Sequence, residues 1–343
     1  MIDIKTLDVS ELERALTSAG FERFRSKQIA DWLKAGVSSF DEMKNLPLKL
    51  RDYLKEHYTI PSAVIERKQV SQIDGTVKYL FRLDDGEYIE SVVMRYHHGA
   101  TICISTQVGC KMGCNFCATG KSGYSRDLSA SEMIAQIDTA QKDLSLRIAN
   151  VVLMGMGEPF DNYENVIQFL HTVSSDQSLN IGMRHITIST CGIVPKIYSF
   201  ADLGLQCGLS ISLHAPTDAL RQQTMPVNRR WPITELMDAC RYYIRRTNRR
   251  ITFEYALISG VNDSDDHARQ LADLLSGMLC HVNLIPVNHV TGSGYLKSSI
   301  KRQQAFVHIL SERGVNATVR RTLGSDIDAS CGQLKRNFTK GDV

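Results

Sequence analysis

The sequence lacks several features that would place it in a specialised class. It has no apolar run of about 18 residues, so we expect no transmembrane helix. Its first residues, MIDIKTLDVSELERAL, carry acidic side chains where a secretory signal has a basic head and an apolar core. Internal repeats and low-complexity segments are absent, and the net charge is only +3. These absences, with 43% apolar and 22% charged residues, favour an ordinary globular protein of the cytoplasm.

Cysteine, by contrast, is plentiful. The 343 residues include nine cysteines in an uneven distribution: Cys103, Cys110, Cys114, Cys117, Cys191, Cys207, Cys240, Cys280 and Cys331. A secreted disulfide framework is usually shorter, has an even number of cysteines and follows a signal peptide. Three cysteines within eight residues, in a chain expected in a reducing compartment, indicate a metal site or catalysis instead.

Hydrophobic periodicity divides the chain into three parts. Residues 1–62 have apolar side chains at helical spacing and predict a small helical domain. Residues 63–100 predict a β-hairpin extension or linker, because Asp-Gly pairs separate their strand-like runs. Those runs are Val64–Val70, Thr76–Leu83 and Tyr88–Tyr96. In residues 101–343, short β-branched runs alternate with amphipathic helices, which predicts an α/β fold with a parallel sheet, open or closed into a barrel.

The unusual short motifs of this third part all follow predicted strands. The strands are Thr101–Thr106, Asn150–Met154, His185–Thr190, Gly208–Leu213, Ile251–Leu257, Val282–Ile285 and Ala317–Arg320. The helices include Ser129–Leu144, Ile233–Arg246, Ser264–Leu275 and Lys301–Arg313. The motifs GCKMGCNFC, GMGEP, STCG and SLHAP follow the first four strands, and PVN follows the sixth. Active sites of (β/α) barrels are built from this end of the strands, so we expect a barrel.

The strongest chemical signal is the motif Cys110-x-x-x-Cys114-x-x-Cys117. Three thiolates in a glycine-rich loop can bind one face of a four-iron cluster and leave one iron open to another ligand. Two alternatives are a structural zinc site, with a fourth ligand such as His97, and a redox pair of Cys114 and Cys117.

Polar residues also follow the other strands. Ser189 and Ser212 with His214 could form a Ser–His catalytic pair, although no G-x-S-x-G motif is present and a lone histidine is more often a hydrogen-bonded structural residue. Asn288 could bind a ribose hydroxyl or simply make a turn. After the second predicted strand, Gly157 allows close approach of the backbone to a ligand, and Glu158 can accept a hydrogen bond from an ammonium group. An ordinary strand-to-helix turn explains the same segment. Cys331 lies in a polar loop next to Gly332, which suits a reactive thiol better than a buried one.

Taken together, these motifs resemble those of one family. The cysteine loop resembles that of radical S-adenosylmethionine (SAM) enzymes. Within that superfamily, Cys103 and the segments GMGEP, STCG, SLHAP, NLIPVN and DIDASCGQL resemble the RlmN-type RNA methyltransferases, over nearly the whole chain. The resemblance implies a partial (β/α) barrel of the radical SAM type, with an N-terminal helical accessory domain that binds RNA.

The resemblance also implies cofactors and residue roles. Cys110, Cys114 and Cys117 are expected to bind a [4Fe–4S] cluster whose open iron chelates SAM. The expected SAM pocket comprises Gly157, Glu158, Ser189, Ser212, Leu213, His214 and Asn288. Cys331 is expected to carry a methyl group, Cys103 to resolve the covalent adduct through a disulfide bond, and Glu90 to act as the base.

The implied reaction methylates C2 of an adenosine in the peptidyl transferase centre of 23S ribosomal RNA, and of the adenosine next to the anticodon in transfer RNA. C2 of adenine is electron-poor and does not attack a sulfonium methyl group. The reaction therefore uses two SAM molecules per turnover, one to methylate Cys331 and one for radical chemistry. The expected partners are these two RNAs and an electron donor such as flavodoxin or ferredoxin, and we expect a monomer.

Other functions remain as alternatives. Cfr-type enzymes methylate C8 of adenine, although Pro159 and the NLIPVN segment favour C2. A radical SAM enzyme for a small molecule and a non-enzymatic zinc protein that binds RNA are the other two. Basic blocks favour RNA: residues 221–250 hold eight arginines and two acids, and residues 301–343 hold eight basic and four acidic residues. A solvated helix face is the alternative explanation of such a block.

Overall fold

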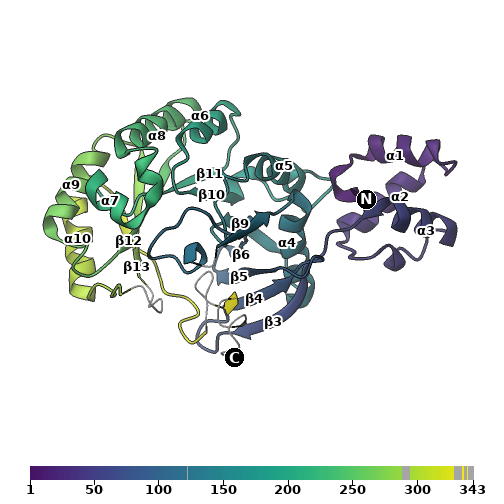
Figure 1. The fold of residues 1–343 in the computed structure, drawn as a ribbon, viewed down its shortest axis with the longest axis horizontal. Coiled ribbons are helices and arrows are strands. Elements are labelled where there is room, and N and C mark those ends of the chain that lie inside the picture. Colours follow the sequence, from purple (N-terminus) through teal and green to yellow (C-terminus); the bar gives the residue numbers. More distant parts are fainter. Residues whose placement is uncertain (122, 288–293, 328–333, 336–337, 339–343) are drawn as a thin grey trace.

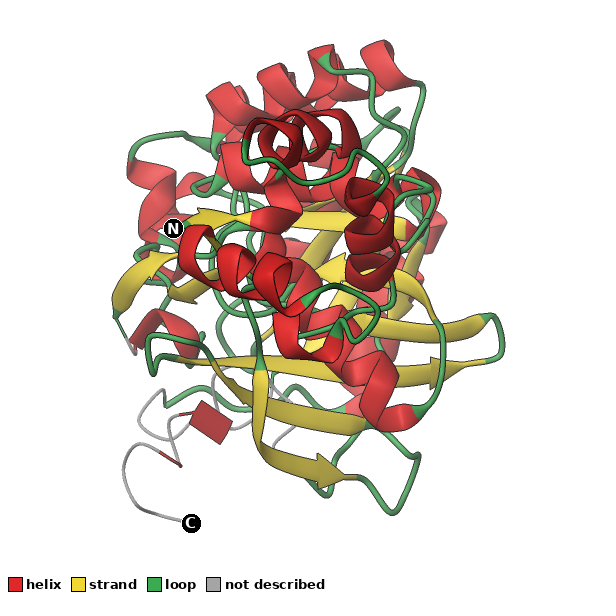
Figure 2. Cartoon of the chain, turned by 90° about the vertical axis from the view of Figure 1, so that its right-hand side faces the viewer, coloured by secondary structure: helices red, strands yellow, loops and turns green. Residues whose placement is uncertain are grey.

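The computed structural model describes residues 1–121, 123–287, 294–327, 334, 335 and 338. They form a small helical unit at the N-terminus and a larger α/β unit (Figure 1). Figure 2, which faces the N-terminal unit, shows helices gathered towards the top of the view and strands towards the bottom.

The N-terminal unit has a hydrophobic core of its own. It consists of α1 (Val9–Ser18), α2 (Arg25–Lys34), α3 (Leu48–His57) and the paired short strands β1 (Ile2–Asp3) and β2 (Tyr58–Thr59). Leucines one helical turn apart, such as Leu12 and Leu16 in α1, are buried in that core. An ion pair of 3.0 Å between Lys5 Nζ and Asp138 Oδ2 joins the unit to α4 (Ala130–Leu144) of the larger unit.

The larger unit is built on one sheet of ten strands, in the order β14-β13-β12-β11-β10-β9-β6-β5-β4-β3. Strands β6 and β9 to β14 are parallel, whereas β3, β4 and β5 pair antiparallel. The strands are β3 (Val64–Val70), β4 (Val77–Arg82), β5 (Tyr88–Tyr96), β6 (Gly99–Cys103), β9 (Ile148–Leu153), β10 (Ile186–Thr190), β11 (Gly208–Ser212), β12 (Ile251–Leu257), β13 (Cys280–Pro286) and β14 (Ala317–Val319). A separate pair, β7 (Gln107–Gly109) and β8 (Tyr124–Asp127), follows β6.

The helices after α4 connect the parallel strands and cover one face of the sheet (Figure 1). They are α5 (Tyr163–Ser174), α6 (Val194–Asp202), α7 (Asp218–Thr224), α8 (Ile233–Thr247), α9 (Asp265–Leu275) and α10 (Ile300–Glu312). The predicted capping box at α4 is present, because Ser129 Oγ accepts from Glu132 N and Glu132 Oε2 accepts from Ser129 N. This arrangement confirms the prediction of a partial (β/α) barrel.

Residues 63–100 join the main sheet as its three antiparallel strands, because β5 pairs with β6. Successive side chains of a strand point to opposite faces of the sheet, so the residue number decides which face each side chain occupies. Ser91 and Val93 of β5 point towards the helices, where Ser91 Oγ donates to Gln136 of α4 at 2.7 Å. Val92 and Met94 point to the opposite, concave face. That concave face carries the candidate site.

Candidate active site

A cavity of about 380 Å³ opens on the concave face at the C-terminal ends of the parallel strands. Nine residues predicted from the sequence line it: Cys103, Cys110, Cys114, Cys117, Gly157, Glu158, Ser189, Ser212 and His214. Leu213 does not line it, since its side chain is fully buried in the main core. Glu90 is not part of the wall either, and Asn288 and Cys331 lie outside the described residues.

The three-cysteine loop is fixed at both ends by backbone contacts. Gly109 has φ = 83°, and a Cβ there would lie 2.0 Å from the carbonyl oxygen of Gly123, so only glycine fits. Cys110 N donates to that same oxygen at 2.8 Å. Asn115 N donates to Thr224 O of α7 at 3.0 Å, which ties the loop to the strand-to-helix segment after β11. The loop is therefore preformed against the cavity.

The loop thiols suit a metal cluster electrostatically. Burial raises the pKa of Cys110 to about 12, and it raises the pKa of Cys114 further. Such thiols ionise only when a cation compensates the charge, as bound iron does. Among the described residues, no three His, Cys, Asp or Glu side chains lie close enough to hold a single metal ion. Three thiolates in one loop are a donor set that a four-iron cluster with one open iron can take, so these residues fit such a cluster.

His97, the candidate fourth zinc ligand, is not near this loop. It lies in the turn before β6, whereas Cys110 follows the other end of that strand. The strand spans about 15 Å between the two ends. His97 and the cysteine loop therefore lie at opposite ends of β6, which argues against a zinc site that combines them.

The GMGEP segment connects two strand ends. A Cβ on Gly157 would lie 2.7 Å from Gln107, so the glycine is needed to pack this loop against β7 and not only to admit a ligand. Glu158 is 4% exposed, and its two oxygens accept from Phe160 N at 3.0 Å and Cys191 N at 2.7 Å. Burial raises the pKa of the Glu158 carboxyl. Glu158 therefore links the loops after β9 and β10, and it also faces the cavity.

His214 is held as a neutral side chain. Its φ of 58° is left-handed, its Nδ1 accepts from Ala256 N at 2.8 Å, and its ring contacts Phe116 edge-on at 4.7 Å. Burial lowers the pKa of His214 to about 3, and the positive charge of Arg221 adds to this effect. Because Nδ1 accepts a hydrogen bond, the neutral ring carries its proton on Nε2, which cannot then take a proton from a serine. A Ser–His catalytic pair, considered from the sequence, therefore has no support in these contacts.

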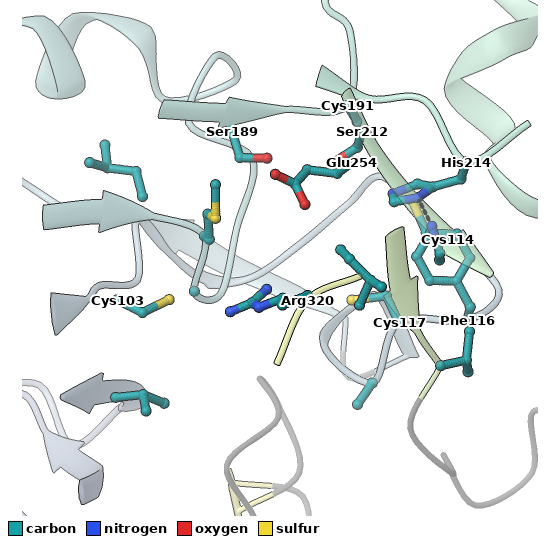
Figure 3. A pocket seen from close by; sticks show the side chains of 18 of the residues that line it. Cys103, Cys114, Phe116, Cys117, Ser189, Cys191, Ser212, His214, Glu254 and Arg320 are labelled. Carbon is teal, nitrogen blue, oxygen red and sulfur yellow. Dashed lines mark hydrogen bonds between the residues drawn. The ribbon is translucent and has the colours of Figure 1, made fainter. Parts of the chain in front are cut away.

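Two buried charged side chains, one in the cavity wall and one behind it, were not predicted. Glu254, in the middle of β12, lines the cavity, and its Oε2 accepts from Asn283 Nδ2 at 2.8 Å. Burial raises the pKa of Glu254, while Arg320 acts in the opposite direction. Figure 3 shows Glu254 and Ser189 on one side of Arg320, whose side chain lies between Cys103 and Cys117 in this view. The sequence signal was a lone acid in the otherwise apolar and β-branched strand ITFEYAL.

The other is Arg221 of α7, which is 0% exposed. It donates to the carbonyls of Cys191, Ser212 and Leu213 at 2.6 to 3.1 Å, and to Asn228 Oδ1 at 3.0 Å. The guanidinium thus joins the ends of β10 and β11 behind the cavity.

Comparisons with known proteins agree with this geometry. Residues 104–272 match the radical SAM superfamily, and residues 2–60 match the ribosomal RNA large subunit methyltransferase N-terminal domain. A probable dual-specificity RNA methyltransferase RlmN from Alkaliphilus oremlandii is 57% identical over 98% of both chains. One from Clostridium tetani is 49% identical over 100% of this chain and 98% of its own.

The chain belongs to the RlmN family. A crystal structure of a radical SAM methyltransferase from Sphaerobacter thermophilus superposes with a TM-score of 0.92. It is 45% identical and covers 97% of this chain and 99% of its own. The protein is thus an enzyme, a radical SAM RNA methyltransferase. Membership implies a [4Fe–4S] cluster and SAM as cofactors, and RNA as the substrate.

Described residues on either side of Cys331 dock beside the RlmN-family cavity. Asp326 accepts from Ser71 Oγ at 2.6 Å and from Gln72 N at 2.8 Å, in the turn between β3 and β4. Lys335 N donates to Glu90 Oε1 at 2.6 Å. Glu90 shares the concave face of β5 with the cavity residues Val92 and Met94, and its Oε2 lies 2.5 Å from Lys78 Nζ.

No disulfide joins any two of the eight cysteines that the structure describes. The pairing expected for this family involves Cys331, outside the described residues, so the structure lends the expected disulfide bond no support. Cys103 is 5% exposed and packs against Val92 and Met94 at the cavity wall.

The arginine-rich block does not form one patch. Arg229 and Arg230 lie between α7 and α8, on the side of the cavity mouth, and Arg230 stacks on Trp231 at 4.7 Å. Arg245, Arg246, Arg249 and Arg250 lie at the far end of α8 or just beyond it. A helix of 15 residues separates the two groups by about 22 Å.

None of the helices that the structure describes is both long and apolar enough to span a membrane.

Proposed function

We propose that this RlmN-family enzyme methylates C2 of an adenosine in 23S ribosomal RNA, and of the adenosine next to the anticodon in transfer RNA, through a methylated Cys331. The observation that carries the proposal is the gathering of Cys103 and the three loop cysteines around one cavity, with the segments flanking Cys331 docked beside it. The names of the relatives supply the dual specificity for RNA.

In this proposal Cys110, Cys114 and Cys117 hold the cluster, and the strand ends around Glu158, Ser189, Ser212 and His214, with Asn288, bind SAM. The bound cofactors, with two SAM molecules per turnover and an external electron donor such as flavodoxin or ferredoxin, supply the methyl group and the one-electron chemistry. The protein orients them: Glu158 and Arg221 hold the strand ends in place, and neutral His214 adds no charge to the pocket.

Chain connectivity supports Cys331 as the carrier. Cys331 is three residues from Leu334, which is fully buried, so chain geometry limits their separation to about 11 Å. Leu334 is adjacent to Lys335, which contacts Glu90 on the concave face. In the proposal, the carrier sulfur enters the cavity that Cys103 lines.

Release of the product requires a thiol and a base. The thiolate of Cys103 attacks Sγ of Cys331 and a disulfide forms. The electron pair of the broken bond between Sγ and the transferred CH2 stays on that carbon, which takes up a proton and becomes the methyl group. Glu90 takes the proton that the ring carbon loses when its hydrogen is replaced by a methyl group. Glu90 Oε1 accepts from Lys335 N in this structure, so proton transfer follows a shift of the C-terminal segment.

Two cysteine variants test the proposal. Cys331→Ala should give neither methylated RNA nor an adduct, whereas Cys103→Ala should stall as a covalent protein–RNA complex on denaturing gels. Cys240→Ala, which removes a buried thiol of α8 outside the cavity, is the matched control and should turn over normally. Normal turnover by Cys103→Ala would contradict the assignment.

The position of the methyl group is measured separately. Mass spectrometry of adenosine from treated RNA should show 2-methyladenosine in both RNAs. A methyl group found mainly at C8 would instead assign the Cfr-type reaction.

A further inference from the structure

A second chamber of about 280 Å³ lies on the same concave face, towards the N-terminal ends of the strands. It is lined by Met94, Tyr96, His98, Thr101, Asn150, Val152, Met154, Arg184, His185, Thr187 and Arg320. Met94, Met154 and Arg320 also line the main cavity, so the two spaces adjoin. Neither the proposed SAM site nor the cluster loop accounts for this chamber.

The strand register places the chamber one step from Cys103. Thr101 lies opposite Met94 on β5 and Asn150 on β9, so these three side chains form a row across the sheet. Cys103 is two residues further along β6 and belongs to the next row, on the same face. Two residues of a strand span about 7 Å. A chemical group bound in the chamber would therefore lie about one row of side chains from a group that contacts Cys103.

The lining residues suit an anion. Two arginines and two histidines contribute to the wall, and none of the described residues that line it is acidic. His185 Nδ1 lies 2.9 Å from Asn150 Oδ1, while Asn150 Nδ2 is buried without a partner among the described residues. Turning the amide over would leave its oxygen without a partner instead. A buried amide N–H of this kind is satisfied by an acceptor, either an ordered water or a ligand oxygen. Arg184 is exposed at the wall, and its guanidinium can donate two parallel hydrogen bonds to a phosphate.

We propose that this chamber is an RNA subsite that binds the phosphodiester next to the methylated nucleotide, with Arg184 and Asn150 as donors. The inference rests on the proposed function in one respect, namely that the target base enters the main cavity. Arg320 lines both spaces and is suited to contact the same strand of RNA. The concave face then holds the substrate at two points, the base beside Cys103 and the phosphate one row away.

The test uses the cluster-loaded enzyme with Arg184→Gln and with Asn150→Asp, which preserves shape but adds a repelling charge. Each should weaken binding of a transfer RNA anticodon stem-loop about tenfold. Arg184→Gln should also lower the slope of log affinity against log salt by about one. Arg269→Gln, which removes one positive charge from α9 in the helix layer, is the control and should change neither quantity. Iron content and SAM affinity should equal those of the wild type throughout.

A modified RNA locates the contact. One neutral methylphosphonate, placed in turn on each side of the target nucleotide, should weaken binding to the wild type at one of the two positions. The same methylphosphonate should weaken RNA binding by the Arg184→Gln enzyme only slightly further, because that enzyme has already lost the contact. Equal losses for both enzymes at both positions would overturn the subsite. A wild type that methylates neither RNA would instead refute the proposed function, whatever the binding data show.

Discussion

The buried pair of Lys78 and Glu90 allows a quantitative prediction. Both side chains are at most 1% exposed, and Lys78 Nζ lies 2.5 Å from Glu90 Oε2. Replacing Lys78 with Met leaves a carboxylate in a site that water does not reach. Breaking a buried pair from one side costs about 3–5 kcal/mol, far more than the net contribution of the pair itself. We expect Lys78→Met to lose stability by this amount.

Two further variants separate charge from packing. Lys78→Met combined with Glu90→Gln removes both charges, keeps the side-chain volumes and preserves an acceptor for Lys335 N, so most of the loss should be recovered. Lys68→Met breaks an ion pair with Asp143 that is 32% and 24% exposed, and it should cost no more than about 1 kcal/mol.

Urea denaturation at matched iron content measures these differences as free energies of unfolding. If Lys78→Met is as stable as the Lys68→Met control, the pair is not a buried pair of charges, and the reasoning fails. If the double variant is no more stable than Lys78→Met, the loss comes from packing and not from removal of the ammonium group beside the carboxylate.

Four other outcomes follow from the site. Alanine at any one of the three loop cysteines should abolish cluster retention, and iron analysis after anaerobic reconstitution checks this. Since burial lowers the pKa of His214 from 6.5 to about 3, the unfolded chain binds a proton at pH 5 that the folded chain does not. The wild type should therefore lose about 2 kcal/mol relative to His214→Asn between pH 7 and pH 5, and parallel stability curves would refute this. Arg221→Met should cost at least about 3 kcal/mol in urea, because it leaves buried carbonyls without donors, and wild-type stability would contradict it. Paired Arg→Gln changes at Arg229 and Arg230 should lower the salt slope of RNA binding; an unchanged slope would make them a solvated surface.

Local patterns determined much of the fold. The strands β3, β5 and β12 begin and end where the sequence predicts, because β-branched alternation and Asp-Gly turns are properties of a few neighbouring residues. The same holds for the capping box at Ser129 and for the glycine-curled loop of three cysteines. Motifs at the carboxyl ends of parallel strands predicted a barrel with its site at that end, and nine of the residues named from the sequence line one cavity there.

Contacts between distant segments decided the rest. Nothing near Glu158 in the sequence indicates that its carboxylate links to Cys191, and nothing near Glu90 indicates that Lys78 and Lys335 engage it. The second chamber exists only because β5, β6, β9 and β10 stand side by side in one register. The sequence by itself determined which elements form and which chemistry the cysteines carry, since both depend on short-range periodicity and residue type. Burial, pairing and cavity shape depend on which elements pack together, so only the tertiary structure decided them.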